Sequence, residues 1–335
     1  MKGTNTCIWK IEKTIEEIIN LMKSDYSKFM EVLSSYQIPE NEKKLIYKWS
    51  SLEQNFNIKK LTINETEIKY IKALAEIETN AIPTNDWIVD NRVLPKDIRV
   101  NKNNSIVLFL ESLGSTYCII IGSKSSEGKI RSTLMESSKR KESRWGKIQF
   151  SDVPGFVFDK HFYYWLIKNK GTSLNINNKN IMLNDVRGFK SDTDRKENSY
   201  SGEGSNIDLE IPLKSLVSMD ERLVSLFVDL KVDNITYNFF LDYDGRISVY
   251  RAECGEFATE TPKQMSIEEI VMNIYYEIIP LLKSCFNKAI SQGWGDIESE
   301  FKKSLSIDVI KELIKQNDIQ IKEIEEALNL ETAEI

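Results

Sequence analysis

Apolar and polar residues alternate most regularly over residues 223–253. Leu226, Val228, Leu230 and Val232 fall on one side of an extended chain, and mostly polar residues fall on the other. The turn-forming stretches Asp233-Asn234 and 242–245 separate this strand from two more, over 235–241 and 247–252. Because such short turns place consecutive strands side by side, this stretch predicts a three-stranded antiparallel meander.

Four further segments have clear patterns. The apolar runs 105–110 and 116–121 flank Gly114 and predict a second hairpin, with strands covered on both faces. Residues 158–168 predict a short aromatic helix that opens at Asp159. Ser266 and Glu269 have capping-box spacing before a long apolar helix, 267–290, which Pro280 is expected to kink. Two shorter helices are predicted over 306–316 and 318–328.

The first 82 residues show apolar positions at helical spacing, among them Ile8, Ile11, Ile15 and Ile18. They predict helices over 8–24, 26–36, 40–55 and 66–79. Turn formers at 82–86 and Pro262 mark the boundaries of three regions: helical 1–82, mixed β-rich 83–262 and helical 263–335. The predicted class is therefore α+β, with a central antiparallel, meander-containing sheet and helical N-terminal and C-terminal regions.

Composition and charge narrow the class of protein. The net charge of −6 over 335 residues argues against a general nucleic-acid binder. No apolar run approaches the roughly 20 residues that span a bilayer, so no membrane association is expected. The four cysteines are scattered, which favours reduced thiols in the cytoplasm over disulfides or a zinc site. Richness in Lys, Asn and Ile suggests an AT-rich bacterial or phage genome.

Two polar segments are candidate binding regions. Residues 129–147 carry seven cations around Trp145, and clustered cations with an indole are typical of phosphate binding and base stacking. The alternative is a solvated charged surface, or one that meets an acidic protein. Residues 188–206 lack apolar periodicity, which predicts a long surface loop with binding potential. The candidate binding residues in the two segments are Lys139, Arg140, Lys141, Arg144, Trp145, Lys147, Lys190, Arg195 and Lys196.

Asp229 and Lys231 form an acid-x-Lys pattern on the first predicted meander strand. With an upstream acid such as Glu210, this layout is typical of nucleases that hold Mg²⁺ or Mn²⁺ through carboxylates. Such three-residue matches are common by chance, and alternation alone places both residues on the polar face. These residues are the weak catalytic candidates.

His161 is the only histidine, which excludes a multi-histidine metal site and leaves a Ser-His-Asp triad possible only if His161 is its base. No other catalytic constellation stands out, and no metal or cofactor is expected. The sequence therefore favours a non-enzymatic protein of bacterial or phage origin that binds another protein or a larger complex. An accessory component of phage defence, or of its inhibition, is an example of such a role. There are two alternatives. The protein could bind nucleic acid through residues 129–147, or it could be a metal-dependent nuclease or other phosphodiester enzyme that uses Asp229 and Lys231.

Overall fold

The computed structural model describes residues 3–24, 26–30, 39–63, 66–90, 92–137, 143–192, 199–257 and 263–333. The chain forms two compact units, and each is built from three separate segments. Unit 1 contains residues 1–157, 244–249 and 266–277; unit 2 contains 158–243, 250–265 and 278–335. These units do not coincide with the three predicted regions.

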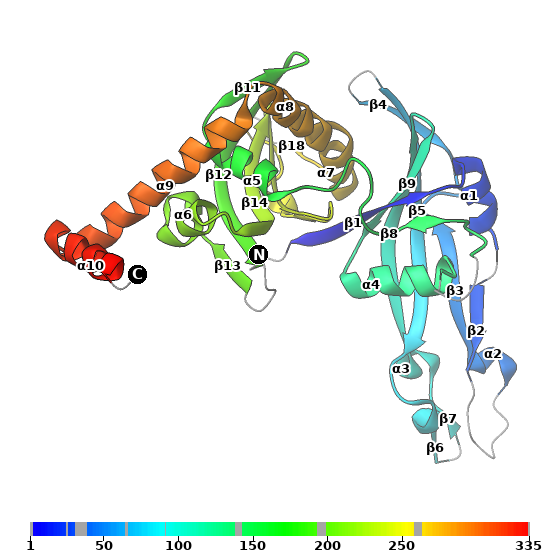
Figure 1. Cartoon of the computed structure of the whole chain (residues 1–335). Helices are drawn as coiled ribbons and strands as arrows, with labels where there is room; N and C mark the ends of the chain where they lie inside the picture. The colour runs from blue at the N-terminus through cyan, green and yellow to red at the C-terminus, as the bar shows by residue number, and fades with distance from the viewer. Residues whose placement is uncertain are drawn as a thin grey trace. The chain divides into compact units, whose positions relative to one another are not determined.

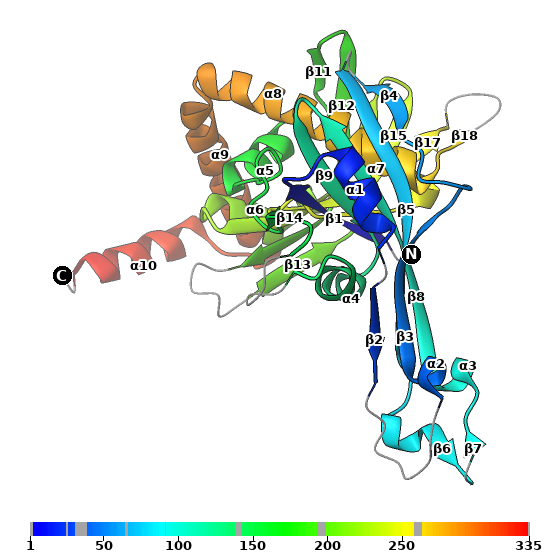
Figure 2. The same ribbon diagram turned by 90° about the vertical axis from the view of Figure 1, so that its right-hand side faces the viewer.

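Unit 1 is built on an antiparallel sheet (Figures 1 and 2). Its strand order is β16 (Ile247–Val249), β1 (Thr4–Ile11), β9 (Ser115–Ile121), β8 (Val100–Ser112), β5 (Thr66–Asn80), β3 (Lys44–Ser51) and β2 (Tyr26–Phe29). Strand β4 (Lys59–Ile63) also pairs with β5, and β10 (Ile148–Gln149) pairs with β1. The predicted hairpin of β8 and β9 is confirmed, and its central residues are buried on both faces.

Helices cover both faces of this sheet. On one face, α1 (Ile15–Met22) and the π-helical turn η2 (Ile130–Leu134), which follows α4 (Lys124–Lys129), pack over Trp9, Phe109 and Trp145. On the other face, the segment from α7 (Ile267–Asn273) into the π-helical η5 (Ile274–Ile278) buries Tyr275. The Tyr275 hydroxyl lies 3.0 Å from that of Thr6 and donates to the Gly245 carbonyl at 2.8 Å.

One end of the sheet carries a small cap (Figure 1). It contains α2 (Glu40–Lys43), η1 (Thr84–Trp87), α3 (Lys96–Arg99) and the hairpin of β6 (Ile88–Val89) and β7 (Arg92–Val93). Arg99 holds it together: the side chain is fully buried, pairs with the Glu42 carboxylate, and stacks over Trp87 at 4.6 Å. A buried cation with these partners is a structural anchor.

The prediction that region 1–82 is helical is wrong for most of the residues that the structure describes there. Residues 4–11, 44–51 and 66–80 are strands, and α1 begins only at Ile15, where Thr14 and Glu17 form a capping box. Ile8 and Ile15 are spaced as on one face of a helix, but Ile8 lies on β1 and Ile15 on α1. The apparent helical pattern therefore combined residues of two different elements. Within β5 the buried residues Ile71, Ala73, Ala75 and Ile77 recur at every second position, as a strand requires.

Unit 2 contains a second antiparallel arrangement in the order β11 (Ser173–Ile176), β12 (Lys179–Asp192), β14 (Arg222–Val232) and β15 (Ile235–Asp242). Strand β13 (Ser199–Glu203) pairs with β12, β17 (Gly255–Glu256) with β15, and β18 (Lys263–Gln264) with β17. The hairpin of β14 and β15 confirms the first two predicted meander strands. The predicted third strand is shorter, because β16 ends at Val249 and η4 (Arg251–Glu253) follows it. The predicted α+β class with a large antiparallel sheet is thus confirmed.

The predicted loop 188–206 is mainly a hairpin, because β12 runs to Asp192 and β13 returns against it. Residues 193–198 lie outside the described residues. Strand β13 is an exposed edge strand with no apolar face, so its sequence carries no alternating pattern. Gly188 allows the Phe240 ring to lie against β12, since a Cβ there would come within 3.0 Å of it.

The helices of unit 2 are α5 (Lys160–Lys168), α6 (Ile211–Ser218), which follows η3 (Ile207–Leu209), α8 (Ile279–Ser291), α9 (Trp294–Gln316) and α10 (Ile321–Ala333). Asp159 caps α5 and Ser266 caps α7, as predicted. The π-helical η5 interrupts the predicted helix 267–290 just before Pro280, which lacks the amide needed to continue the α-helical pattern. Among the helices of the described residues, none is long and apolar enough to cross a membrane.

Candidate functional site

The apolar residues Ile130, Leu134, Met135 and Trp145 of the predicted basic segment 129–147 belong to the core of unit 1. Trp145 is fully buried, with its ring 5.7 Å from those of Trp49 and Phe109. This position corrects the predicted role of Trp145, since a buried indole has no free face on which a base can stack. Arg144 pairs with Glu136 at 2.8 Å and lies over the Tyr26 ring.

Of the remaining predicted binding residues, the structure describes Lys147 and Lys190. Lys147 is exposed on unit 1, and Lys190 is exposed on β12 of unit 2 with its Nζ 5.1 Å from the centre of the Phe240 ring. Lys139, Arg140 and Lys141 lie outside the described residues, as do Arg195 and Lys196. A shared binding surface for these residues stays a prediction.

The weak catalytic candidates lie on two elements of unit 2. The Asp229 carboxylate on β14 accepts a hydrogen bond from the Asn184 amide at 3.0 Å, and Lys231 follows it on the same face of the strand. Glu210 is exposed just before α6. Across the described ranges, no group of three or more His, Cys, Asp or Glu side chains is placed to hold a metal ion.

A connected polar cluster in unit 2 surrounds His161 on α5. His161 Nδ1 lies 2.8 Å and 2.9 Å from the two carboxylate oxygens of Glu298 on α9, and the Glu298 side chain is only 6% exposed. With the proton on Nδ1, the neutral imidazole donates to this carboxylate and keeps Nε2 as an acceptor. The imidazole side chain is 46% exposed, so the pair ties α5 to α9 while one side of the ring faces solvent.

Lysine residues extend this cluster to the turn before β14. Lys302 lies 3.2 Å from Glu298 and 3.1 Å from Asp220, and Lys160 lies 2.6 Å from Asp220. Partial burial raises the pKa of Asp220, but the hydrogen bonds from Lys160 and Lys302 outweigh it and hold the pKa below its usual value. Burial lowers the pKa of Lys302, and its two carboxylate partners more than reverse this effect and raise it. The cluster fixes α5, α9 and the turn as one piece.

Helix α6 packs against α9, and Lys214 on α6 lies 3.5 Å from Glu312 on α9. Helical spacing places Leu305 and Val309 on the same face of α9 as Glu298 and Glu312, so this face is the inner one. Helix α9 is therefore held along its length by α5 and α6.

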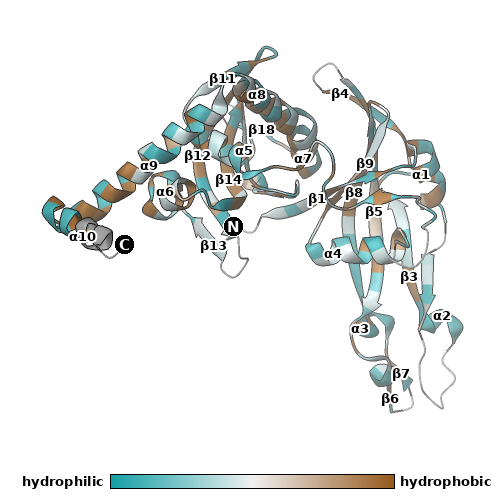
Figure 3. Cartoon of the chain, in the orientation of Figure 1, coloured by the Kyte–Doolittle hydropathy of each residue, from teal (hydrophilic) through white to brown (hydrophobic). Residues whose placement is uncertain are grey.

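The opposite face of α9 also carries apolar residues. Ile307 and Ile310 are 44% and 52% exposed, and Ile321 on α10 is 68% exposed. Figure 3 shows brown apolar positions that recur along both helices. We call Ile307, Ile310 and Ile321 the apolar stripe.

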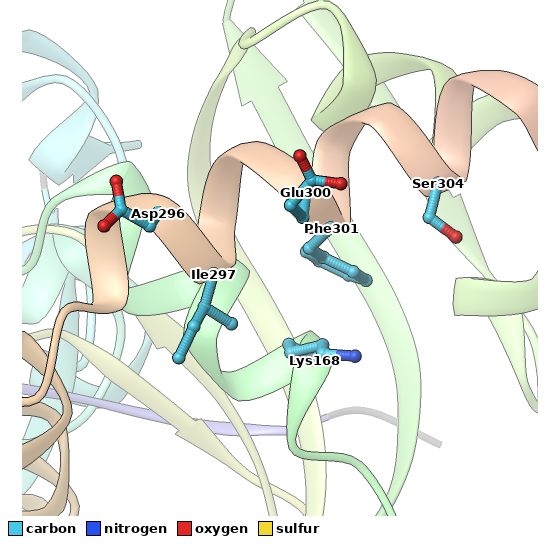
Figure 4. Close-up of a pocket in the computed structure, with 6 residues that line it drawn as sticks. All are labelled: Lys168, Asp296, Ile297, Glu300, Phe301 and Ser304. Atoms are coloured by element: carbon cyan, nitrogen blue, oxygen red, sulfur yellow. The ribbon is translucent and has the colours of Figure 1, made fainter.

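A shallow depression of about 390 Å³ lies beside the first turns of α9 (Figure 4). Ile297 and Phe301 point toward Lys168 on α5, and the Lys168 Nζ lies 5.4 Å from the centre of the Phe301 ring. Asp296, Glu300 and Ser304 complete the lining. Its accessible lining is mainly apolar with charged groups at the rim.

The first three turns of α9, with Glu298, Phe301 and Lys302, lie before the helix predicted over 306–316. The preceding helix α8 ends at Ser291, and Gly293, at φ 89°, is the N-cap of α9, with Gly295 in its first turn. The spacing of four between Glu298 and Lys302 is the signal that indicated a helix there.

Comparison with known proteins gives no family. A scan against models of protein families found no match, and a search of curated proteins found no similar sequence.

Proposed function

We propose that the protein is a non-enzymatic binding protein that docks a partner protein on the apolar stripe of α9 and α10. The observation that carries this proposal is that α9 is apolar on two opposite faces, of which α6 covers one. Leaving Ile307 and Ile310 about half exposed on a helix has a cost that burial against a partner removes.

The spacing of the stripe indicates the kind of partner. Ile307, Ile310 and the neighbouring, partly buried Ile314 are three and four residues apart on α9. This is the spacing with which one helix packs along another. We therefore expect the partner to present an apolar helix, which rests on the stripe as in other helix-on-groove complexes.

The biological setting of this proposal rests on composition and on the cysteines. Cys7, Cys118, Cys254 and Cys285 are free, which supports a cytoplasmic protein. The richness in Lys, Asn and Ile supports a bacterial or phage source, and an accessory role in phage defence or in its inhibition fits both.

Site-specific photocrosslinking in cells of the native host tests the stripe. A photoreactive residue in place of Ile310 should form a crosslink to a defined protein, and Ile307→Asp in the same chain should abolish it. The matched control replaces Lys315, an exposed residue on another face of α9, and should form no such product. Equal products from both positions, or a product that survives Ile307→Asp, would contradict docking on the stripe.

A second arm addresses nucleic acid and catalysis. The purified protein is incubated with labelled DNA and RNA in the presence of Mg²⁺ or Mn²⁺. If the protein only binds a partner through the apolar stripe, neither the DNA nor the RNA should be cleaved. Cleavage that Asp229→Ala removes would replace the binding proposal with the nuclease alternative. Stable binding of nucleic acid without cleavage, weakened by Lys147→Ala, would instead indicate nucleic acid bound through residues 129–147 as the partner.

A further inference from the structure

The depression beside the first turns of α9 is a second, separate surface. Its floor is apolar, because Ile297 is 47% exposed and the ring of Phe301 is partly accessible beside it. One rim carries the Lys168 ammonium, which already rests on the Phe301 ring. The other rim carries the carboxylates of Asp296 and Glu300 (Figure 4).

These two carboxylates differ from the other acids of α9. Glu298 and Glu312 pair with cations on the inner face of the helix. Asp296 and Glu300 are exposed, one turn apart, and neither forms an ion pair with any residue that the structure describes. The helix dipole favours Asp296 in the first turn, but Glu300 gains little from it.

We propose that the depression binds a protein segment that presents an aliphatic or aromatic side chain next to Lys or Arg residues. The apolar side chain covers Ile297 and Phe301, and the cations meet Asp296 and Glu300. The apolar floor provides contact area for the apolar side chain of such a segment, and the two exposed carboxylates provide charge complementarity for its cations.

The same features exclude other classes of ligand. A phosphate backbone is repelled by the acidic rim. The volume lies near the lower end of the roughly 300–1,000 Å³ of small-molecule sites, but those sites enclose most of their ligand, and this depression is shallow and open. A side chain that belongs to a larger partner needs no such enclosure.

This proposal uses the first half of α9 and does not depend on the apolar stripe of its second half. Selection from a library of random peptides, with the full-length protein as the target, tests it directly. We expect enrichment of peptides that combine an apolar residue with neighbouring Lys or Arg. Enrichment of no motif, or of an acidic one, overturns the proposal.

Variants then locate the binding. Glu300→Lys should weaken the enriched peptides by about tenfold, through loss of an attraction and gain of a repulsion. Ile297→Ser should weaken them to a similar degree, and because Ile297 is half exposed the variant keeps its fold, as circular dichroism can verify. The control is Glu323→Lys, the same charge change at an exposed site on α10, which should leave affinity unchanged.

The outcomes separate this inference from the proposed function. Peptide affinity that Glu300→Lys and Ile297→Ser leave intact overturns the inference, while loss of the crosslink at Ile310 concerns only the stripe. Light scattering across concentrations adds a further check. Self-association that Ile297→Ser abolishes would assign the depression to a second copy of the chain and would also overturn the inference.

Discussion

Replacing Glu298 by alanine should destabilise unit 2 measurably. The carboxylate is almost fully buried and is shared by His161 and Lys302. The substitution removes the acceptor for both and takes away the charge that holds α9 against α5. It also removes the γ-methylene group from a packed site.

The size of the effect follows from these contacts. A hydrogen bond to a charged group contributes about 1.5–3 kcal/mol, and loss of a buried partner has the largest effect when the remaining groups stay dry. Here His161 is 46% exposed, and Lys302 keeps Asp220, so water and a second carboxylate compensate in part. We expect a loss of about 2 kcal/mol, which corresponds to a midpoint shift of roughly 4–8 °C for a unit of this size.

Urea and thermal unfolding followed by circular dichroism measure this loss. The control is Glu300→Ala, which removes an exposed acid without an ion pair from the same helix and should change stability by less than about 0.5 kcal/mol. A double-mutant cycle of His161→Ala with Glu298→Ala should show a coupling of about 1 kcal/mol. Equal effects of Glu298→Ala and Glu300→Ala would refute the view that this cluster fastens α9.

Four further outcomes are expected. Trp145→Ala should destabilise unit 1 by about 3–5 kcal/mol in urea unfolding, since it empties a core site; a loss under about 1 kcal/mol would contradict the buried position. Gly245→Ala should cost at least about 1–2 kcal/mol by the same assay, because φ is 79° and a Cβ would lie 2.5 Å from the Phe156 carbonyl oxygen; unchanged stability would disprove this turn geometry. Because the pKa of Asp220 is lowered in the folded state, its ionised form contributes stability above about pH 4, and this stability is lost as the pH falls through the lowered pKa. Asp220→Asn should therefore make the free energy of unfolding depend less on pH in the acid range. The same pH dependence in the variant and the original protein would count against the network. Burial raises the pKa of the Cys254 thiol to about 11, so mass spectrometry after alkylation should find half-buried Cys285 modified first and Cys254 only after unfolding.

Local signals predicted the parts of the fold that depend on local chemistry. The alternation through Val228 and Leu230, with the turn at Asp233, gave the hairpin of β14 and β15. The caps at Asp159 and Ser266 located the starts of α5 and α7. Each of these features is decided by residues within one turn of a helix or one crossing of a strand.

The errors arose where long-range pairing decides the structure. Ala73 and Ala75 favour helices in isolation, but β3 and β8 pair with β5 on both sides and make it a strand. The edge strand β13 is held only by β12 and has no apolar face to reveal it. Glu298 and His161 are 137 positions apart, so no spacing rule could have joined them.

Each unit is built from segments that are far apart in the sequence, and this affects how the chain can fold during synthesis. When residue 157 leaves the ribosome, the sheet of unit 1 still lacks strand β16, which pairs with β1, and the surface that Tyr275 will cover is bare. Unit 2 likewise needs the helices that follow residue 278. We therefore expect neither unit to complete its fold before most of the polypeptide has emerged. A nascent chain stalled midway would expose apolar sheet surface, which chaperones bind.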